Sequence, residues 1–334
     1  MNFIAYLREQ GVEVTHDLVE RYDVILTNHW SVPYTTLLRG LRRNIDLRLV
    51  HRIDGSAQDY GRDPRADVGQ RAVNVLADVT LFQSRYARYA TREKFPAITQ
   101  DGPVIYNPVD TTLFTPEGDQ YAALEGFTYD NKVCTATWST NPKKGAESIY
   151  TVARANPDIG FVLCGNYQDA PALPNIRCLG VLGRTELATA MRSCTVFLTF
   201  SENEACPNVV LEALASGLPV LYIDSGGTRE LVEECGYAVE AQSFRATLDS
   251  MMARRPELAS MARKRAESEF SPAKVFSQYL QLIEDALAAP PRLPIKQRRQ
   301  LAWSPNQVIK YNSRLWARRI GISRLAGRAM RSVS

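Results

Sequence analysis

Short apolar runs alternate along this chain with segments whose apolar positions recur at helical spacing. In the first part, strands are predicted over 24–29, 47–54, 79–84 and 103–109, with helices over 31–43, 67–77 and 85–95. After Asp130 the alternation restarts, with strands over 132–138, 159–165, 176–182, 195–201 and 218–224, and helices beginning near Gly145, Arg184, Asn208 and Gly227. Apolar strands separated by amphipathic helices are typical of parallel sheets covered on both faces. The pattern predicts an α/β protein with two doubly wound domains.

The polar stretch 115–131 contains glycine and separates the two alternating regions, so it is interpreted as a linker. Two long helical segments follow the second region, at about 244–269 and 272–289, and the prolines at 290, 291 and 294 are then expected to end the globular body. The predicted organisation is a first domain over 1–120, a second domain over 121–270, a terminal helix over 271–290 that packs back on the first domain, and a tail over 291–334.

The composition is that of an ordinary globular protein, with 334 residues, 45% hydrophobic and 23% charged. No apolar run approaches the ~18 residues of a transmembrane helix, and the N-terminus lacks the pattern of a signal peptide. The six cysteines include no Cys-x-x-Cys pair, and there are only three histidines, so a zinc site is not expected. The cysteines are interpreted as buried, reduced thiols of a cytoplasmic protein.

The net charge of +4 is unevenly distributed. The segment from Arg292 to the end holds 11 basic and no acidic residues, whereas the first 291 residues carry 29 basic and 36 acidic ones. Tryptophans at 303 and 316 lie among these basic residues. Such a tail is either solvated or contacts an anionic membrane surface, which would place the protein on the inner face of the plasma membrane. Nucleic-acid binding is a weaker alternative, because the body is acidic.

The richest candidate chemistry lies in SENEACPNVVLEALASGLPV (201–220). A loop leaves the carboxyl end of the strand over 195–201, Pro207 suits a first helical turn, and a helix follows from Asn208. The N-terminus of a helix favours phosphate, because its backbone N–H groups have no helical partner. Glu204 precedes this helix, and Glu212 lies four residues after Asn208 on the same face. The two carboxylates are therefore placed to hold hydroxyl groups on either side of a bound phosphate.

Two further turns follow neighbouring strands. One contains Lys143 and Lys144 directly before Gly145, and lysine at a strand-to-helix turn suits phosphate oxygens, although such a turn taken alone is more often a solvated loop. The other contains Gly226 and Gly227, where the backbone can approach a ligand closely. A Walker phosphate loop is absent from the sequence.

Taken together, SENEACPNVVLEALASGLPVLYIDSGGTREL resembles the donor-site signature of family 4 glycosyltransferases. That signature is Glu, seven residues, Glu, then Ala-x-x-x-Gly-x-Pro-Val, matched here by Glu204, Glu212, Ala213, Gly217, Pro219 and Val220. The resemblance extends over residues 1–290 and is best over 132–240. HRIDG (51–55) and WSTNPKKG (138–145) are also similar to a bacterial surface-polysaccharide subgroup. The resemblance to family 4 implies the GT-B fold, in which two Rossmann-like domains face a cleft.

The resemblance implies a retaining hexosyltransferase that uses a nucleoside-diphosphate sugar, with a glycan or lipid-linked glycan as acceptor and neither a metal nor another cofactor. By analogy Lys144 meets the diphosphate, Glu212 the ribose, and Glu204 the sugar near its reacting carbon. The implied donor side also includes Ser139, Gly165, Leu182, Gly183, Asn208 and Val209. On the acceptor side Asp54 is assigned to the acceptor hydroxyl, with His29 and His51 nearby.

The sequence departs from the family in three places. Trp138 and Ser139 stand where a Gly-Arg pair is usual, so one phosphate-binding cation is missing or supplied elsewhere, and Ala205 replaces a frequent glycine. The family's first strand and Gly-rich loop do not precede the helix predicted near residue 3. The hypothesis is that the true start lies upstream or that the chain is truncated; a stop codon just before Met1 would contradict it.

Two alternative functions remain open. The first is a non-catalytic sugar- or nucleotide-binding protein of this fold with a degenerate site. The second is a nucleotide-sugar epimerase, which the spacing of Lys144, Glu204 and Glu212 disfavours.

Overall fold

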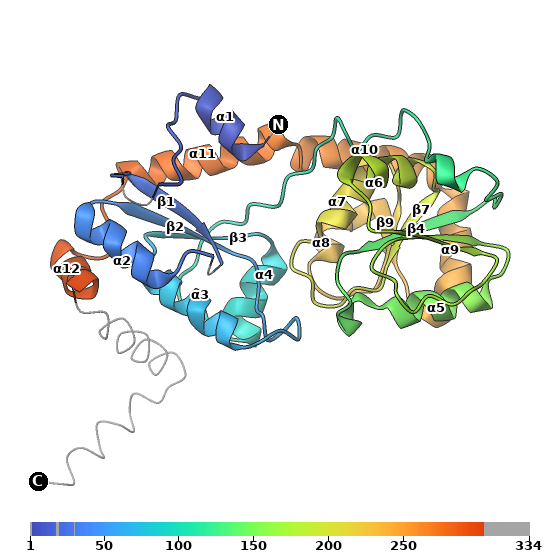
Figure 1. Ribbon diagram of the computed structural model, residues 1–334, viewed down its shortest axis with the longest axis horizontal. Coiled ribbons are helices and arrows are strands. Elements are labelled where there is room, and N and C mark those ends of the chain that lie inside the picture. The colour runs from blue at the N-terminus through green and yellow to red at the C-terminus, as the bar shows by residue number, and fades with distance from the viewer. Residues whose placement is uncertain (1, 18–19, 30, 304–334) are drawn as a thin grey trace, which may run out of the picture. The chain divides into compact units, whose positions relative to one another are not determined.

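The computed structural model describes residues 2–17, 20–29 and 31–303 (Figure 1). The chain divides into two compact units. Unit 1 comprises Tyr106–Ser277 with the N-terminal residues up to Tyr6, and unit 2 comprises Leu7–Ile105 with the residues from Gln278 onward. The division falls inside two helices, α1 (Phe3–Glu9) and α11 (Pro272–Ala288).

Unit 2 contains a parallel sheet in the order β1-β2-β3, built from Val24–Asn28, Arg48–Ile53 and Val79–Phe82. Its helices include α2 (Tyr34–Arg43), α3 (Arg65–Leu76) and α4 (Arg85–Tyr89), which continues into a π-helical turn, η1 (Ala90–Lys94). The fourth strand predicted over 103–109 is reduced to one parallel bridge between Phe82 and Val104. The apolar side chains of α2 and α3 form the core of this unit with those of the sheet, including Leu37, Leu38, Leu41, Leu49 and Val73.

Unit 1 contains a parallel sheet in the order β6-β5-β4-β7-β8-β9. Its strands are Lys132–Thr137 (β4), Gly160–Gly165 (β5), Ile176–Gly180 (β6), Val196–Thr199 (β7), Val220–Tyr222 (β8) and Gly236–Ala238 (β9). The main helices are Ala146–Ala155 (α5), Arg184–Arg192 (α6), Asn208–Ala215 (α7), Thr228–Val232 (α8), Phe244–Ala253 (α9) and Arg255–Glu269 (α10). The order reverses at β4, which lies between β5 and β7, so the point where doubly wound sheets bind ligands falls between the ends of β4 and β7.

The central strands of unit 1 are buried on both faces, which explains their nearly continuous apolar sequences. In β4, Val133 packs into one apolar cluster while its neighbour Cys134 packs into the cluster on the other face. Five of the six cysteines are buried, as expected, but Cys178 is exposed. The prediction of six buried thiols is therefore wrong at Cys178, which lies on the edge strand β6, where no further strand covers it.

Two local features differ from the sequence prediction. The short strand β9 was not predicted. It has only three residues and follows directly after a 3-10 turn. The helix expected over 244–269 is two helices, α9 and α10, separated at Arg254. Pro256 lies in the first turn of α10 and explains the break, because proline cannot donate a helical hydrogen bond and its ring clashes with the preceding turn.

The ordered body also continues beyond the prolines that were expected to end it. Helix α12 (Ile295–Trp303) follows Pro294, and Leu301 and Ala302 are buried in the same apolar cluster as Leu37 and Leu41 of α2. Pro294 begins a helix here, since its carbonyl accepts from the Arg298 amide at 3.0 Å and a first helical turn tolerates proline. The rest of the predicted tail, 304–334, lies outside the described residues. Within the described part of the chain, every helix is too short or too polar to cross a bilayer.

Candidate active site

The loops that follow β4 and β7 meet in unit 1, as expected at the reversal of strand order. The Glu202 amide donates to the carbonyl of Lys143 at 2.8 Å, which joins the two loops through their backbones. The side chains of Lys144 and Glu204 form an ion pair between Nζ and Oε1, and each is only 14% exposed. The structure therefore brings together two residues that lie 60 positions apart and that sequence reasoning assigned to one site.

The lysine turn is held by hydrogen bonds from the backbone amides of Lys143 and Lys144 to Asn141. The side-chain oxygen of Asn141 accepts from the Lys143 amide at 3.0 Å, and its carbonyl accepts from the Lys144 amide at 2.8 Å. Gly145 then adopts a left-handed conformation with φ of 74° before α5 begins. Because these bonds use only main-chain atoms of the two lysines, the charged end of the Lys144 side chain takes no part in holding the turn.

Gly145 is required at this turn for two reasons, strain and space. A Cβ atom there would lie 2.5 Å from Phe200 Cβ and 2.6 Å from the Phe200 carbonyl oxygen. Gly180, in the same unit, has φ of 67° with no heavy atom within 4 Å of such a Cβ. We therefore expect Gly180→Ala to cost about 1–2 kcal/mol, the strain of the left-handed conformation alone. Gly145→Ala should cost clearly more, as measured by thermal unfolding; equal losses in both variants would contradict this.

Helix α7 begins beside the ion pair. Pro207 occupies its N-cap position, and no side chain caps this end. The Asn208 side-chain oxygen accepts from Asn107 Nδ2 at 2.7 Å, and the same amide group donates to the Cys206 carbonyl at 3.1 Å. Val209 is buried. Sequence reasoning missed Asn107, which sits in the strand-like segment 103–109 and carried no motif that pointed to this loop.

The glycine pair after β8 packs against the loop that carries Glu204. The Gly227 amide donates to the Glu204 carbonyl at 2.7 Å. A Cβ at Gly226 would lie 2.5 Å from the Glu204 carbonyl oxygen, and one at Gly227 would lie 2.0 Å from that of Ala205. The two glycines therefore allow the loop that carries Glu204 to pack closely against the chain, where sequence reasoning expected a ligand to approach.

Glu212 lies inside α7 and is mostly buried. Loss of hydration raises the pKa of its carboxyl from 4.5 to about 7, and the charge of Arg184 opposes this shift. Arg184 begins α6 and was not among the predicted site residues. A carboxyl with such a pKa is partly protonated near neutral pH, so it can both donate to and accept from a hydroxyl group.

This pKa predicts a pH-dependent cost of folding. Below pH 4.5 the Glu212 carboxyl is protonated in both folded and unfolded chains. Between 4.5 and about 7 the unfolded chain ionises while the folded chain keeps its proton, so stability falls as pH rises. Glu212→Gln removes this loss. We expect the melting temperature of the variant, relative to the unmodified protein, to be higher at pH 8 than at pH 5; a difference that does not change with pH would contradict the assignment.

The remaining predicted donor-side residues lie at the ends of the same sheet. Ser139 follows β4, and its hydroxyl accepts from the Asn141 amide at 3.2 Å, so it stabilises the lysine turn. Gly165 ends β5 with φ of 108°, and a Cβ there would lie 1.8 Å from the Thr137 carbonyl oxygen. Leu182 is buried and Gly183 is exposed, and the Gly183 amide donates to Glu186 at 2.7 Å. That amide is therefore occupied by a helix cap.

The predicted acceptor-side residues belong to unit 2. Asp54 follows β2, where its carboxylate pairs with Arg52 and accepts from Asn28 at 2.7 Å. His29 follows β1 with φ of 52°, and its ring Nδ1 is 2.6 Å from the side-chain oxygen of Gln70. Both side chains are partly exposed.

His51 does not fit the role predicted for it. Its side chain has no exposed surface, and its Nε2 lies 2.6 Å from the His29 carbonyl oxygen. Burial lowers the pKa of His51 to about 3, so the ring is neutral. The structure gives no support to the acceptor-side role predicted for His51, because β2 is the central strand of its sheet and the His51 side chain is fully covered.

Each unit carries a parallel sheet with helices, and the solved structures that match the chain have the GT-B fold, which confirms the fold predicted from the sequence. Solved structures with this fold include sucrose-phosphate synthase from Thermosynechococcus elongatus, with a TM-score of 0.66 and 20% identity, covering 86% of this chain and 76% of that chain. Another is HepE from Anabaena in complex with UDP, with a TM-score of 0.66 and 20% identity, covering 79% of each chain. At this level of identity the likeness concerns the fold alone.

Residues 140–254, which lie in unit 1, match the family model described as Glycosyl transferases group 1, in agreement with the resemblance of the motif. Curated relatives include the GDP-mannose-dependent alpha-mannosyltransferases of Mycolicibacterium smegmatis, 32% identical over 59% of this chain and 54% of the relative, and of Mycobacterium tuberculosis, 31% identical over 54% and 49%. The matched region thus spans about half the length of these relatives.

Proposed function

We propose that this chain is a glycosyltransferase that moves a hexose from a nucleoside-diphosphate sugar to a glycan or lipid-linked glycan, with retention of anomeric configuration. The observation that carries the proposal is the Lys144–Glu204 ion pair beside the uncapped N-terminus of α7, within the region that matches the Glycosyl transferases group 1 family model. A diphosphate needs a cation and unpaired N–H groups, and the sugar needs acceptors for its hydroxyls. This corner of unit 1 offers both.

In the proposed reaction the bond between the sugar's anomeric carbon and the diphosphate oxygen breaks, while the acceptor oxygen forms a new bond to the same carbon. The departing diphosphate gains negative charge, which Lys144 and the positive end of the α7 dipole stabilise. Glu204 contacts the sugar, and Glu212 holds the ribose. The acceptor proton passes to the departing phosphate, so Asp54 positions the acceptor and no metal ion takes part.

Nucleotide binding is the direct test of this site. The names of the relatives suggest GDP-mannose as the first donor to try, with UDP-glucose as the comparison. A nucleotide that binds only the folded chain at 100 times its dissociation constant should stabilise it by about 2.7 kcal/mol, seen as a rise in melting temperature. We expect GDP or UDP to produce this rise and Lys144→Ala to abolish it. No shift with either nucleotide in the unmodified protein would contradict the proposal.

A non-catalytic binding protein of the same fold is the second candidate. Two observations favour it. Ser139 stands where the family has a cation, and the Ser139 hydroxyl already accepts a hydrogen bond within the turn. This candidate predicts nucleotide stabilisation without sugar transfer or donor hydrolysis.

A lipid-linked acceptor would also require the protein to work at the inner face of the plasma membrane, and the cytoplasmic peripheral location inferred from the sequence is part of the proposal.

A further inference from the structure

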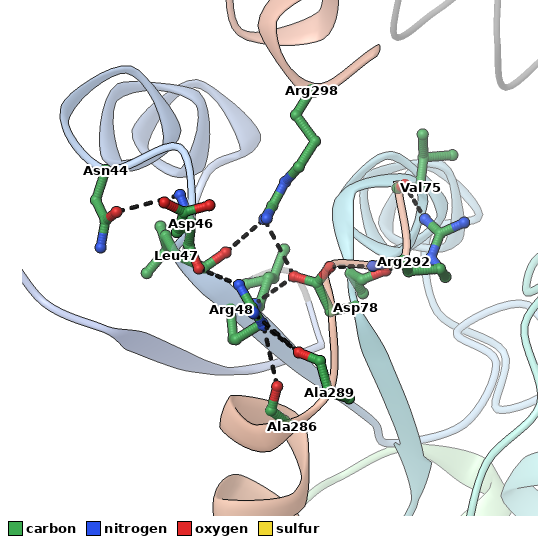
Figure 2. A network of polar contacts seen from close by, with 12 residues as sticks. Asn44, Asp46, Leu47, Arg48, Val75, Asp78, Ala286, Ala289, Arg292 and Arg298 are labelled. Carbon is green, nitrogen blue, oxygen red and sulfur yellow. Dashed lines mark hydrogen bonds and ion pairs between the residues drawn. The ribbon is translucent and has the colours of Figure 1, made fainter. Parts of the chain in front are cut away.

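An arginine-rich contact fastens the segment after α11 to the sheet of unit 2; we call it the arginine clasp and define it by Arg48, Asp78, Arg292 and Arg298 (Figure 2). The Arg298 side chain is 1% exposed, pairs with Asp78 at 3.1 Å, and donates to the Leu47 carbonyl. The other Asp78 oxygen accepts from the Arg292 amide at 2.9 Å. The Nη1 atom of the same guanidinium is buried without a hydrogen-bond partner, so the pair offsets only part of the desolvation of Arg298. The contact ties α12 to the residues that precede β2 and β3.

The clasp continues through side-chain bonds to backbone carbonyls. Arg292 donates to the Ala77 carbonyl at 2.6 Å, and Arg48 donates to the Ala286 carbonyl at 3.0 Å. At the far end of α12, Arg42 of α2 donates to the Ala302 carbonyl at 2.6 Å and lies 5.2 Å from the centre of the Trp303 ring. Helices α2 and α12 are thus locked side by side (Figure 1).

The outward side of this helix pair is strongly basic. Neither α2 nor α12 contains an Asp or Glu residue. Their exposed cations, which we call the α2–α12 basic face, are Arg39, Arg42, Arg43, Lys296 and Arg299. Ile295 and Trp303 are exposed on the same helix pair, and Trp303 keeps 68% of its surface accessible. Five exposed cations and an exposed indole, with no carboxylate on the two packed helices, make a surface that is both positive and partly apolar.

We propose that the α2–α12 basic face docks on an anionic lipid bilayer, an inference that rests on the proposed use of a lipid-linked acceptor. Each basic residue held near such a surface adds attraction, and a tryptophan inserts its ring at the headgroup level. A nucleic acid would engage the same cations, but the exposed Ile295 and Trp303 favour lipid, since phosphate contacts give them no apolar partner. The arginine clasp already holds α12 in place in the absence of a membrane, so binding requires no ordering of α12.

The test uses the full chain and vesicles of phosphatidylcholine with or without 25 mol% phosphatidylglycerol. The salt concentration is about 0.1 M, at which electrostatic attraction extends over ~10 Å. The variant Arg39→Glu, Lys296→Glu, Arg299→Glu changes the face. The control Arg154→Glu, Lys264→Glu, Lys274→Glu has the same net charge and alters exposed residues of unit 1. We expect the face variant to bind anionic vesicles at least about tenfold more weakly and the control to stay within about twofold.

Three results would overturn this inference. They are unchanged vesicle binding in the face variant, an equal loss in the control, and loss of binding to a DNA duplex without loss of binding to vesicles. The nucleotide-induced melting shift should persist in the face variant, because the altered residues lie in unit 2 whereas Lys144 lies in unit 1. A chain that binds vesicles but shows no nucleotide shift would contradict the proposed function and leave the docking surface standing.

Discussion

Lys144→Ala and Glu204→Ala are each expected to lower turnover at least about 100-fold with the sugar donor that gives the melting shift. Removing Lys144 takes away the cation proposed to meet the departing diphosphate and breaks its ion pair with the Glu204 carboxylate, which is only 14% exposed. Removing Glu204 takes away the group proposed to hold the sugar. Initial rates at saturating donor, with the circular dichroism spectrum as a check on folding, give the measurement.

The neighbouring lysine provides a matched control for this prediction. The backbone of Lys143 joins the two loops, since its amide donates to Asn141 and its carbonyl accepts from Glu202. Lys143→Ala keeps both bonds and removes one charge from the same turn. We expect its loss of turnover to be at least tenfold smaller than that of Lys144→Ala. If Lys144→Ala and Glu204→Ala both keep the full rate, the proposed site is wrong.

Arg298→Met is expected to produce the largest loss of stability among the changes considered, because it leaves the Asp78 carboxylate buried without its cation. Arg298 is 1% and Asp78 5% exposed, and breaking a buried pair of this kind costs about 3–5 kcal/mol. The loss should appear in urea unfolding and as faster hydrogen exchange in β2 and β3, the strands next to the clasp.

Two companion variants make the Arg298 prediction specific. Arg65→Ala breaks an ion pair with Asp63 on the exposed surface of the same unit and should change stability little. The double variant Arg298→Met, Asp78→Asn removes both charges, so it should recover a large part of the loss. A small effect of Arg298→Met alone would show that the clasp does not hold α12.

Most of the fold was predictable because the central strands of the parallel sheet of unit 1 are buried on both faces. Runs such as residues 195–201 and 159–165 are therefore mainly apolar, and the helices between them showed their own spacing. The proximity of Lys144 and Glu204 was predictable for a related reason, since carboxyl ends of adjacent parallel strands share one edge. Their ion pair confirms that expectation.

What the sequence concealed depends on contacts between distant segments. The prolines before α12 indicated an end, but proline also suits the first turn of a helix, and only burial of Leu301 against α2 decides between the two. His51 looked like a site residue because it lies near a strand end, yet β2 is the central strand of its sheet and is covered on both faces at this point. The strand β9 has only three residues, too few for a periodic signal.

The lone accessible thiol makes unit 1 open to site-specific labelling. Because Cys178 is exposed on the edge strand β6 and the other five cysteines are buried, a maleimide dye should react at one position on the folded protein. Partial burial raises the pKa of Cys178, so the reaction calls for mildly alkaline buffer. The fluorophore would then report, in real time and without any substitution, on motions of unit 1 as nucleotides are added.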